Sequence, residues 1–494
     1  MSNFTRLNKL IMRPEIKVVS DCGPTDSVLF FAVGGEIPTG AELSPAERDY
    51  ASRCIEKGDT TIHINRYERS IFFVSPGKDL PDWRSREEAR KAACEVISAA
   101  EKNFIKELTI VGPDEAVGLA EAFVEGMLLG SYRFDRYKTT AKERELLPSL
   151  LKVVDSRPVD VKELRWSEVV AEAVYMARDL INEPVIKMNS TTFVNEVTSM
   201  GKSGGFRVEV LGKSRIEALR MGGLLAVNRG SIDPPAFMVL EWKPEDARNS
   251  NPLLFVGKGV MYDTGGMNVK PGSYMEGMKG DMAGAAAVAS LLYVVAKCRL
   301  PIHVMALIPV TDNRVNGNAI VPGDIIRTHN GMSVEIVNTD AEGRLLLADA
   351  LSYSDLFTPS LVVSIATLTG SAEATFGTFA GAVMGNAEEE HFELLSSTGY
   401  SVYERVARLP FWHEYGEAMK SDIADLKNLG SRNGGAINAG KFLESFVKAP
   451  FIHIDIAGPA ILKKDDHYRK KDGPGFGVRL LAGFCRSFSE KSGS

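Results

Sequence analysis

The segment NTDAEGRL, residues 338–345, sets two carboxylates and a guanidinium between a strand-like run and a helix-like run. Residues 333–337 contain alternating β-branched side chains, whereas residues 345–351 are mostly apolar, as in a buried helix. This arrangement constrains the fold, because a strand that leads through a short turn into a helix is typical of α/β domains. In such domains, ligands bind at the carboxyl ends of the strands.

Asp340, Glu342 and Arg344 are spaced two residues apart in this turn. Side chains two apart point the same way on an extended segment, so we expect all three to face one crevice. A plainer interpretation makes both acids first-turn residues that favour the helix dipole, with Arg344 as their partner at the surface. A second charged cluster favours the first interpretation.

The second cluster, Lys258, Asp263, Lys270 and Asp281, lies on glycine-rich loops that follow an apolar strand-like run. It is not a phosphate-binding loop, because the spaced upstream glycine and the Ser or Thr after the lysine are absent. Four carboxylates in one cleft cannot all stay ionised without compensating charge, which divalent metals supply. With seven histidines and no HExxH or Cys/His spacing, the chain favours oxygen ligands, which suit two metals bridged by shared carboxylates.

The length of 494 residues predicts two domains, because a single core rarely grows so large. Strand-like runs alternating with helical runs, such as 85–100 and 114–128, predict a smaller α/β domain over residues 1–158 with a structural or assembly role. Its last part, residues 136–158, is polar and charged and is interpreted as an exposed connection. Residues 159–183 are interpreted as a connecting helix, and residues 184–494 as a larger domain with a mostly parallel mixed sheet flanked by helices.

Composition and cysteine usage bear on the surroundings of the protein. The formal net charge of −6 gives no overall electrostatic footprint for nucleic acid or for an anionic membrane. Five cysteines without a CxxC pair favour a reducing compartment, and the first residues have no apolar core of signal-peptide length. The longest apolar stretch, residues 282–296, is too short to span a bilayer and predicts a close-packed core helix. We therefore expect a cytoplasmic protein with neither membrane nor nucleic-acid partners.

The two clusters resemble those of the leucine aminopeptidases, the cytosolic dizinc exopeptidases, whose signature is NTDAEGRL. The resemblance spans residues 182–481 and includes GKG (257–259), DTGG (263–266), TLTG (367–370), ADL (424–426) and DIAGPA (455–460). It implies that residues 184–494 are a metallopeptidase domain that removes amino-terminal residues, preferably Leu and other apolar ones, from peptides. It also implies a macro-domain-like amino-terminal domain and a homohexamer built as two stacked trimers.

The resemblance assigns a role to each charged residue. Two divalent metal ions would be bound by five ligands: Lys258, Asp263, Asp281, Asp340 and Glu342. Asp263 and Glu342 would bridge the two ions, with a metal-bridging water or hydroxide as the nucleophile. Lys270 would stabilise the oxyanion of the tetrahedral intermediate, and Arg344 would hold a bicarbonate ion that acts as general base. The residues alone leave plainer roles open, since both lysines also fit surface cations and Arg344 a structural arginine.

The residues leave alternatives for the metal, the substrate pocket and the reaction class. Zinc, manganese, cobalt and magnesium all bind among oxygen ligands. The resemblance implies a pocket for the first side chain formed by Met278, Thr367, Gly370 and Ala460, although Met278 also fits a core methionine. A two-metal phosphoesterase or nuclease would gather similar carboxylates, but Lys258 and the lack of histidine ligands favour the aminopeptidase. The overall acidity disfavours a non-catalytic DNA-binding role.

Overall fold

The computed structural model describes residues 13–491 except 114, 115, 117, 140–146 and 155–158. The chain forms two compact units. Unit 1 comprises Met1–Tyr175 together with Asp465–Lys470, and unit 2 comprises Met176–Lys464 together with Lys471–Ser494. The division at Tyr175 falls inside helix α5 (Val161–Asn182), which forms where the sequence predicts a helix.

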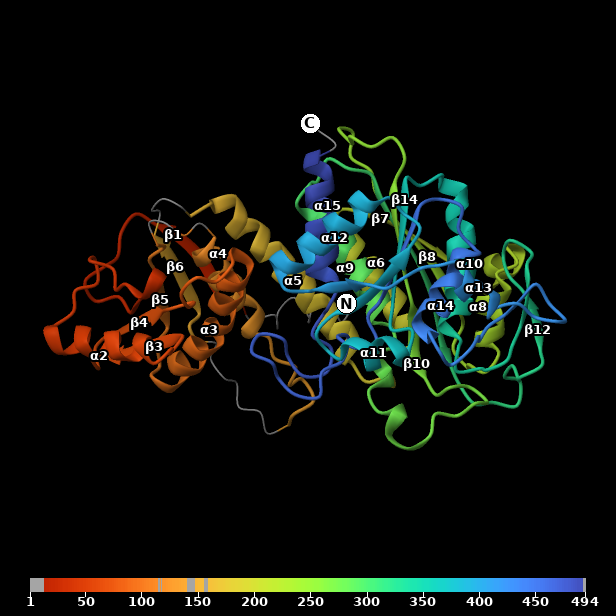
Figure 1. Cartoon of the computed structure of the whole chain (residues 1–494), viewed down its shortest axis with the longest axis horizontal. Helices are drawn as coiled ribbons and strands as arrows, with labels where there is room; N and C mark the ends of the chain where they lie inside the picture. Colours follow the sequence, from red (N-terminus) through yellow and green to blue (C-terminus); the bar gives the residue numbers. More distant parts are fainter. Residues whose placement is uncertain (1–12, 114–115, 117, 140–146, 155–158, 492–494) are drawn as a thin grey trace. The chain divides into compact units, whose positions relative to one another are not determined.

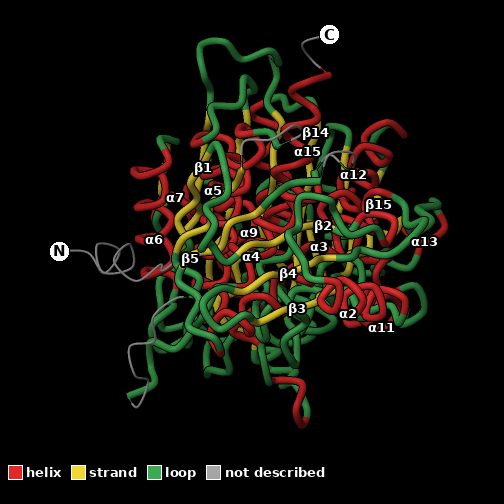
Figure 2. The backbone as a smooth tube through the Cα atoms, turned by 90° about the vertical axis from the view of Figure 1, so that its left-hand side faces the viewer, coloured by secondary structure: helices red, strands yellow, loops and turns green. Residues whose placement is uncertain are grey.

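Unit 1 is built on a six-stranded sheet in the order β1-β6-β5-β2-β4-β3. Neighbouring strands are parallel except β3 and β4, which are antiparallel. These two strands lie side by side in Figure 2. Helices α3 and α4 pack closely at Gly126 of α4. A Cβ there would lie 2.4 Å from the Arg90 carbonyl oxygen of α3, so a glycine allows this approach. The elements are β1 (Glu15–Val19), β2 (Val28–Phe31), η1 (Val33–Gly35), α2 (Pro45–Glu56), β3 (Thr61–Asn65), β4 (Ser70–Val74), α3 (Asp82–Lys102), β5 (Glu107–Ile110), α4 (Leu119–Gly130) and β6 (Leu150–Val154).

Strand β6 corrects the interpretation of residues 136–158 as an exposed connection. It pairs in parallel with β1 on one side and β5 on the other, so it is an inner strand of the sheet. Leu151 and Val153 are fully buried, while the Lys152 ammonium group lies 2.7 Å from a Glu107 carboxylate oxygen. The strand has only five residues and follows a charged stretch, so its apolar residues were not recognised as a strand.

Two expected segments of unit 1, the connection over 136–158 and the helix over 114–128, lie partly outside the described residues. The parts outside are residues 140–146 and 155–158 of the expected connection, and residues 114, 115 and 117 of the expected helix. The observed helix α4 begins at Leu119 and ends at Gly130.

Unit 2 contains a nine-stranded mixed sheet, which confirms the predicted larger α/β domain. The main path is β16-β15-β18-β14-β9-β11-β8-β7, and β10 continues the line of β9 along β11. The central strands β18, β14, β9, β10 and β11 are parallel, whereas β15 pairs with β18, β8 with β11 and β7 with β8 in antiparallel fashion. A small separate sheet has the order β12-β13-β17.

The strands of unit 2 are β7 (Arg207–Leu211), β8 (Ala236–Trp242), β9 (Leu253–Gly257), β10 (Gly259–Asp263), β11 (Val304–Asn313), β12 (Ile325–Arg327), β13 (Ser333–Glu335), β14 (Leu361–Ala366), β15 (Gly381–Gly385), β16 (Val406–Arg408), β17 (Leu426–Lys427) and β18 (Phe451–Asp455). Its helices after α5 are α6 (Ser190–Gly204), α7 (Lys213–Ala218), α8 (Gly222–Asn228), η2 (Gly272–Met275), η3 (Met278–Gly280), α9 (Ala283–Lys297), α10 (Gly343–Ser354), η4 (Asp355–Phe357), α11 (Gly370–Phe376), α12 (Glu389–Val402), α13 (Glu414–Glu417), α14 (Gly435–Glu444) and α15 (Val478–Lys491).

Helices cover both faces of the large sheet, as Figure 1 shows. Helix α9 packs on β9, β11 and β14 beside α6 and α15, and α10 packs on the opposite face with α8 and α14. Strand alternation explains this division, because Leu254 and Val256 join the hydrophobic core with α10, whereas Gly257 faces α9. A Cβ at Gly257 would lie 2.7 Å from Ala285 Cα, so the glycine allows α9 to approach the sheet closely.

Helix α9 is the core helix that residues 282–296 predict. All of its residues from Ala283 to Ala296 are buried. The surrounding stretch Gly272–Lys297 is long and apolar enough for a membrane span, but 89% of its most apolar window is buried inside the structure. Such burial is the mark of a helix that fills the interior of a folded domain.

Candidate metal centre

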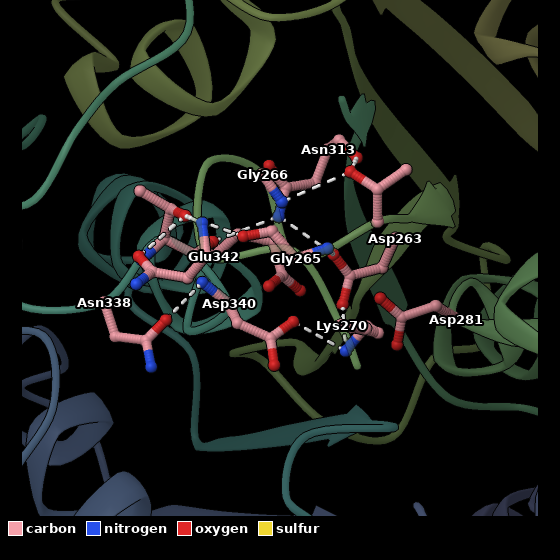
Figure 3. A network of polar contacts seen from close by, with 12 residues as sticks. Asp263, Gly265, Gly266, Lys270, Asp281, Asn313, Asn338, Asp340 and Glu342 are labelled. Carbon is pink, nitrogen blue, oxygen red and sulfur yellow. Dashed lines mark hydrogen bonds and ion pairs between the residues drawn. The ribbon is translucent and has the colours of Figure 1, made fainter. Parts of the chain in front are cut away.

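The charged residues of the two predicted clusters meet at the carboxyl ends of the central strands, and Figure 3 shows Asp263, Lys270, Asp281, Asp340 and Glu342 among them. Lys258 follows β9, and Asp263 is the last residue of β10. Asp281 caps the short helix η3, and Glu342 is the N-cap of α10. Because the central strands are parallel, their carboxyl ends gather residues that are far apart in the chain.

Lys258 is buried between two carboxylates. Its Nζ donates to Asp281 Oδ1 at 2.8 Å and to the Thr367 carbonyl oxygen at 2.9 Å, and it lies 2.9 Å from Glu342 Oε1. The lysine side chain passes beside Gly343, where a Cβ would lie only 2.4 Å from Lys258 Cε. A side chain at position 343 would therefore force the Lys258 side chain to shift.

Lys270 pairs with the other two acids. Its Nζ lies 2.7 Å from Asp263 Oδ2 and 2.6 Å from Asp340 Oδ1. One ligand oxygen each of Asp263, Asp340 and Glu342 lies within 4.8 Å of the others, a spacing that fits a shared metal ion. The structure thus brings together all four predicted carboxylates, with Asp281 joined to the other three through Lys258.

The cluster holds four carboxyl groups and two ammonium groups, so full ionisation would leave a negative surplus charge. Burial, reinforced by the charge of Glu342, raises the pKa of Asp263 to about 7, and burial also raises the pKa of Asp281 well above its usual range. Burial opposes the charged form of Lys258, but Asp281 and Glu342 outweigh it and raise the pKa of the lysine. Asp281 Oδ2 and Glu342 Oε2 are buried without a hydrogen-bond partner among the described residues. Unpaired buried carboxylate oxygens are costly, and a bound cation removes that cost.

Arg344 lies in the first turn of α10, which corrects the expectation of one extended segment. Glu342 already has helical backbone angles, φ −75° and ψ −39°, so strand alternation does not relate it to Arg344. Arg344 is 4% exposed, and its Nε and Nη1 have no hydrogen-bond partner in the part of the chain that the structure describes. Burial lowers the pKa of Arg344 to about 10, which leaves the guanidinium charged at neutral pH. A buried cation with two unpaired donors suits a small planar anion.

The four predicted pocket residues lie on three segments: Met278 just before Asp281, Thr367 and Gly370 at the junction of β14 and α11, and Ala460 after β18. The Thr367 hydroxyl donates to Asp281 Oδ1 at 2.7 Å, so Thr367 lies directly at the cluster. Gly370 begins α11, and a Cβ there would meet no atom of the described chain within 4 Å, so the space beside it is open. Met278 begins η3 and is half-buried, while Ala460, in the turn after β18, is 1% exposed.

Family models match both parts of the chain. Residues 175–482 match the catalytic domain of the cytosol aminopeptidase family, and residues 61–141 match its N-terminal domain. The chain belongs to the cytosol aminopeptidase family. This membership confirms the resemblance to leucine aminopeptidases, and with it the predicted hydrolase class of metal-dependent aminopeptidases acting on peptides.

Individual relatives support the assignment of this aminopeptidase along most of its length. A probable cytosol aminopeptidase of Chlorobium limicola is 40% identical over 85% of this chain and 86% of the relative. One of Brucella melitensis is 40% identical over 76% of this chain and 77% of the relative. Among solved structures, the bottromycin maturation enzyme BotP is similar with a TM-score of 0.81 at 28% identity, covering 94% of this chain and 100% of that chain. A second structure of BotP is a complex with Mn.

Three asparagines that the sequence analysis overlooked hold the segments of this charged cluster in place. Asn268 Oδ1 accepts a hydrogen bond from the Thr339 backbone N–H at 2.9 Å. Asn428 Nδ2 donates to the Asn338 carbonyl oxygen at 2.7 Å. Asn313 contacts both halves of the centre. Asn313 ends the apolar strand β11, so a search for polar residues at the ends of apolar runs would have found it. Asn428 follows no apolar run of that length and carries no such signal.

Proposed function

We propose that this chain hydrolyses amino-terminal residues from peptides, with Leu and other apolar residues preferred, using two divalent metal ions. The five ligands would be Lys258, Asp263, Asp281, Asp340 and Glu342. The observation that carries the proposal is the convergence of three carboxylate oxygens within 4.8 Å, beside two lysines that pair with them. The donor set fits divalent metals, because it is dominated by oxygen atoms and includes buried carboxylate oxygens that have no hydrogen-bond partner among the described residues.

The bound metal ions would supply Lewis acidity and lower the pKa of a bound water that serves as nucleophile. Lys258 would give up its proton to act as a ligand, since an ammonium group has no lone pair. We infer zinc at both positions, with manganese, cobalt or magnesium able to replace it beside Asp340. The Asp340 side chain is 33% exposed, whereas those of Asp281 and Glu342 are 6% and 2% exposed, which supports easier exchange at that position.

Lys270 would stabilise the negative charge that develops on the carbonyl oxygen of the scissile bond. Burial opposes its charge, but Asp263 and Glu342 outweigh this and raise the pKa of Lys270, so the ammonium group stays charged. Both of its contacts are to carboxylates that frame the centre, at 2.7 and 2.6 Å, so the cation needs little reorganisation.

Arg344 would hold a bicarbonate ion in the role of general base. The support is the pair of buried guanidinium nitrogens, Nε and Nη1, without a hydrogen-bond partner among the residues described. Buried guanidinium N–H donors without a partner favour an anionic acceptor. A substrate or another small carboxylate would satisfy the same donors, so bicarbonate dependence needs its own measurement.

The first side chain of the peptide would occupy a pocket formed by Met278, Thr367, Gly370 and Ala460. Open space beside Gly370 and the half-buried Met278 support an apolar pocket next to the charged cluster. We also propose, from the family resemblance, a cytoplasmic homohexamer built as two stacked trimers. Light scattering after gel filtration tests it, since a hexamer of this 53.8 kDa chain has six times that mass.

The deciding experiment compares two substrates with one metal-loaded preparation. The protein is stripped with a chelator, reloaded with Zn²⁺ or Mn²⁺, and incubated with a leucine chromogenic amide and with an aryl phosphate. We expect hydrolysis of the amide that disappears with the metal and returns on reloading. Addition and removal of bicarbonate in the same assay tests the role of Arg344. Cleavage of the phosphate alone would refute the peptidase assignment.

A further inference from the structure

Asn313 is a buried neutral residue at the meeting point of the two charged clusters. It is the last residue of β11 and is 3% exposed. Its Cα lies opposite that of Asp263 in the parallel pair β10–β11, just after a register irregularity between Val260 and Asp263. Figure 3 shows its side chain directed at the carboxylate of Asp263.

The amide nitrogen of Asn313 makes two hydrogen bonds that reach different segments. Nδ2 donates to Asp263 Oδ1 at 2.8 Å and to the Thr339 carbonyl oxygen at 3.0 Å. The backbone oxygen of Asn313 also accepts from the Thr264 N–H at 3.0 Å and from its hydroxyl at 2.9 Å. One residue therefore holds the Asp263 loop by side chain and backbone, and joins it to the residue that precedes Asp340.

These contacts determine how the Asp263 carboxylate is presented. Oδ1 accepts from Asn313 Nδ2 and from the Gly265 N–H, both at 2.8 Å, while Oδ2 faces Lys270. Two donors on one oxygen and a cation on the other leave the carboxylate little freedom to rotate. The bond to Thr339 adds a second constraint, because it limits the distance between Asp263 and the segment that carries Asp340 and Glu342.

We propose that Asn313 is a positioning residue for metal binding: its amide NH₂ orients Asp263 and sets the separation between Asp263 and the 339–342 segment. The inference rests on the proposed two-metal function. A neutral double donor is required at this position, since an aspartate would offer no N–H and would put a fifth carboxylate 2.8 Å from Asp263. Groups that orient metal ligands typically change metal affinity about 10–100-fold when removed.

Asn228 is a matched control for Asn313. It is also a buried asparagine beside β11, 8% exposed, and its Nδ2 donates to the Asp233 carbonyl oxygen at 2.9 Å and to the Thr311 hydroxyl at 3.0 Å. Neither of its acceptors belongs to a proposed metal ligand. Substitution at either asparagine removes two buried hydrogen bonds, so a purely structural role would give the two positions the same behaviour.

The experiment measures Mn²⁺ binding by titration calorimetry and thermal stability for wild type, Asn313→Ala, Asn313→Asp, Asn228→Ala and Asn228→Asp. We expect about 10–100-fold weaker Mn²⁺ binding for Asn313→Ala, a larger loss for Asn313→Asp, and wild-type affinity for both Asn228 variants. We also expect kcat of the Asn313 variants with the leucine amide to fall even at saturating Mn²⁺. Asn313→Ser, too short to reach both acceptors, gives the same comparison if Asn313→Asp does not fold.

Two failures are distinguishable. Wild-type protein that neither binds Mn²⁺ nor cleaves the amide would refute the two-metal function itself. Wild-type protein that binds Mn²⁺, together with Asn313 variants whose affinity stays within twofold of it, would overturn the positioning role. Equal losses of Mn²⁺ affinity at Asn313 and Asn228 would overturn it as well, because the effect would then be general destabilisation.

Discussion

Helices α10 and α12 both begin with acidic residues, but the two groups of carboxylates lie in opposite surroundings. Asp340 and Glu342 precede α10 and meet Asp263 from another strand end. Glu388 and Glu390 stand at the start of α12 with His391, also close enough together to hold an ion, yet both glutamates are exposed. The same ligand types therefore occur in a cluster with two buried acids, Asp263 and Glu342, and in a group whose glutamates are both exposed.

The difference shows what a metal centre needs beyond ligand atoms. The exposed group comes from one helix start, where acids favour the helix dipole and water solvates them. In the buried group, Asp263 and Glu342 are each 2% exposed, and ligands converge from several strand ends beside two lysines. Burial makes their negative charge costly, so a bound cation would gain more free energy there than at the exposed group.

The most severe test of the comparison removes a central ligand. We expect Asp263→Ala to lose bound metal and to lower kcat/KM for the leucine amide by more than about 1,000-fold, because its carboxylate faces both other acids and Lys270. Metal content by elemental analysis and amide hydrolysis check it. Glu390→Ala, in the exposed group, is the control and should match wild type; wild-type activity in Asp263→Ala would remove Asp263 from the centre.

A second test separates metal binding from turnover. We expect Lys270→Ala to keep both metals while kcat falls about 100–1,000-fold, since the ammonium group would stabilise only the transition state. Elemental analysis is combined with steady-state kinetics. Lys297→Ala is the control, because Lys297, the last residue of α9, donates to the Ser203 carbonyl oxygen and lies over the Tyr293 ring, so it contacts none of the proposed ligands. Loss of metal together with turnover would make Lys270 a structural residue instead.

A third test uses the tight packing that distinguishes the buried group. In Gly343→Ala the new methyl group would meet Lys258 Cε at 2.4 Å, so the lysine must move within a buried site. We expect about 1–3 kcal/mol lower free energy of unfolding and weaker Mn²⁺ binding. Denaturant unfolding and calorimetry measure the two effects. Gly416→Ala is matched to it, since a Cβ there meets no described atom within 4 Å; unchanged Mn²⁺ affinity in Gly343→Ala would contradict the packing argument.

The smallest effect is expected in the exposed group. Glu390→Gln combined with His391→Ala should change the free energy of unfolding by less than about 0.5 kcal/mol and leave metal stoichiometry unaltered. Thermal unfolding with and without Mn²⁺, beside metal analysis, provides the measurement. A reduced metal count in this double variant would show that exposure alone does not separate the two groups.

Local patterns predicted much of this molecule. The apolar run that precedes Lys258 forms the central strand β9, and residues 282–296 form the buried helix α9. Strand β6 was missed because Lys152 interrupts a five-residue run beside a charged stretch. Its membership of the sheet depends on pairing with β1 and β5, which are distant in the chain and leave no local signal.

The sequence by itself singled out the residues proposed to carry the chemistry, because acids, lysines and glycines at strand ends follow from local spacing and composition. Only the tertiary structure decided that Asp263 meets Asn313, 50 residues away, and that Arg344 is buried with two unpaired nitrogens among the residues described. Strand order and register depend on the packing of the whole core, so no short segment encodes them.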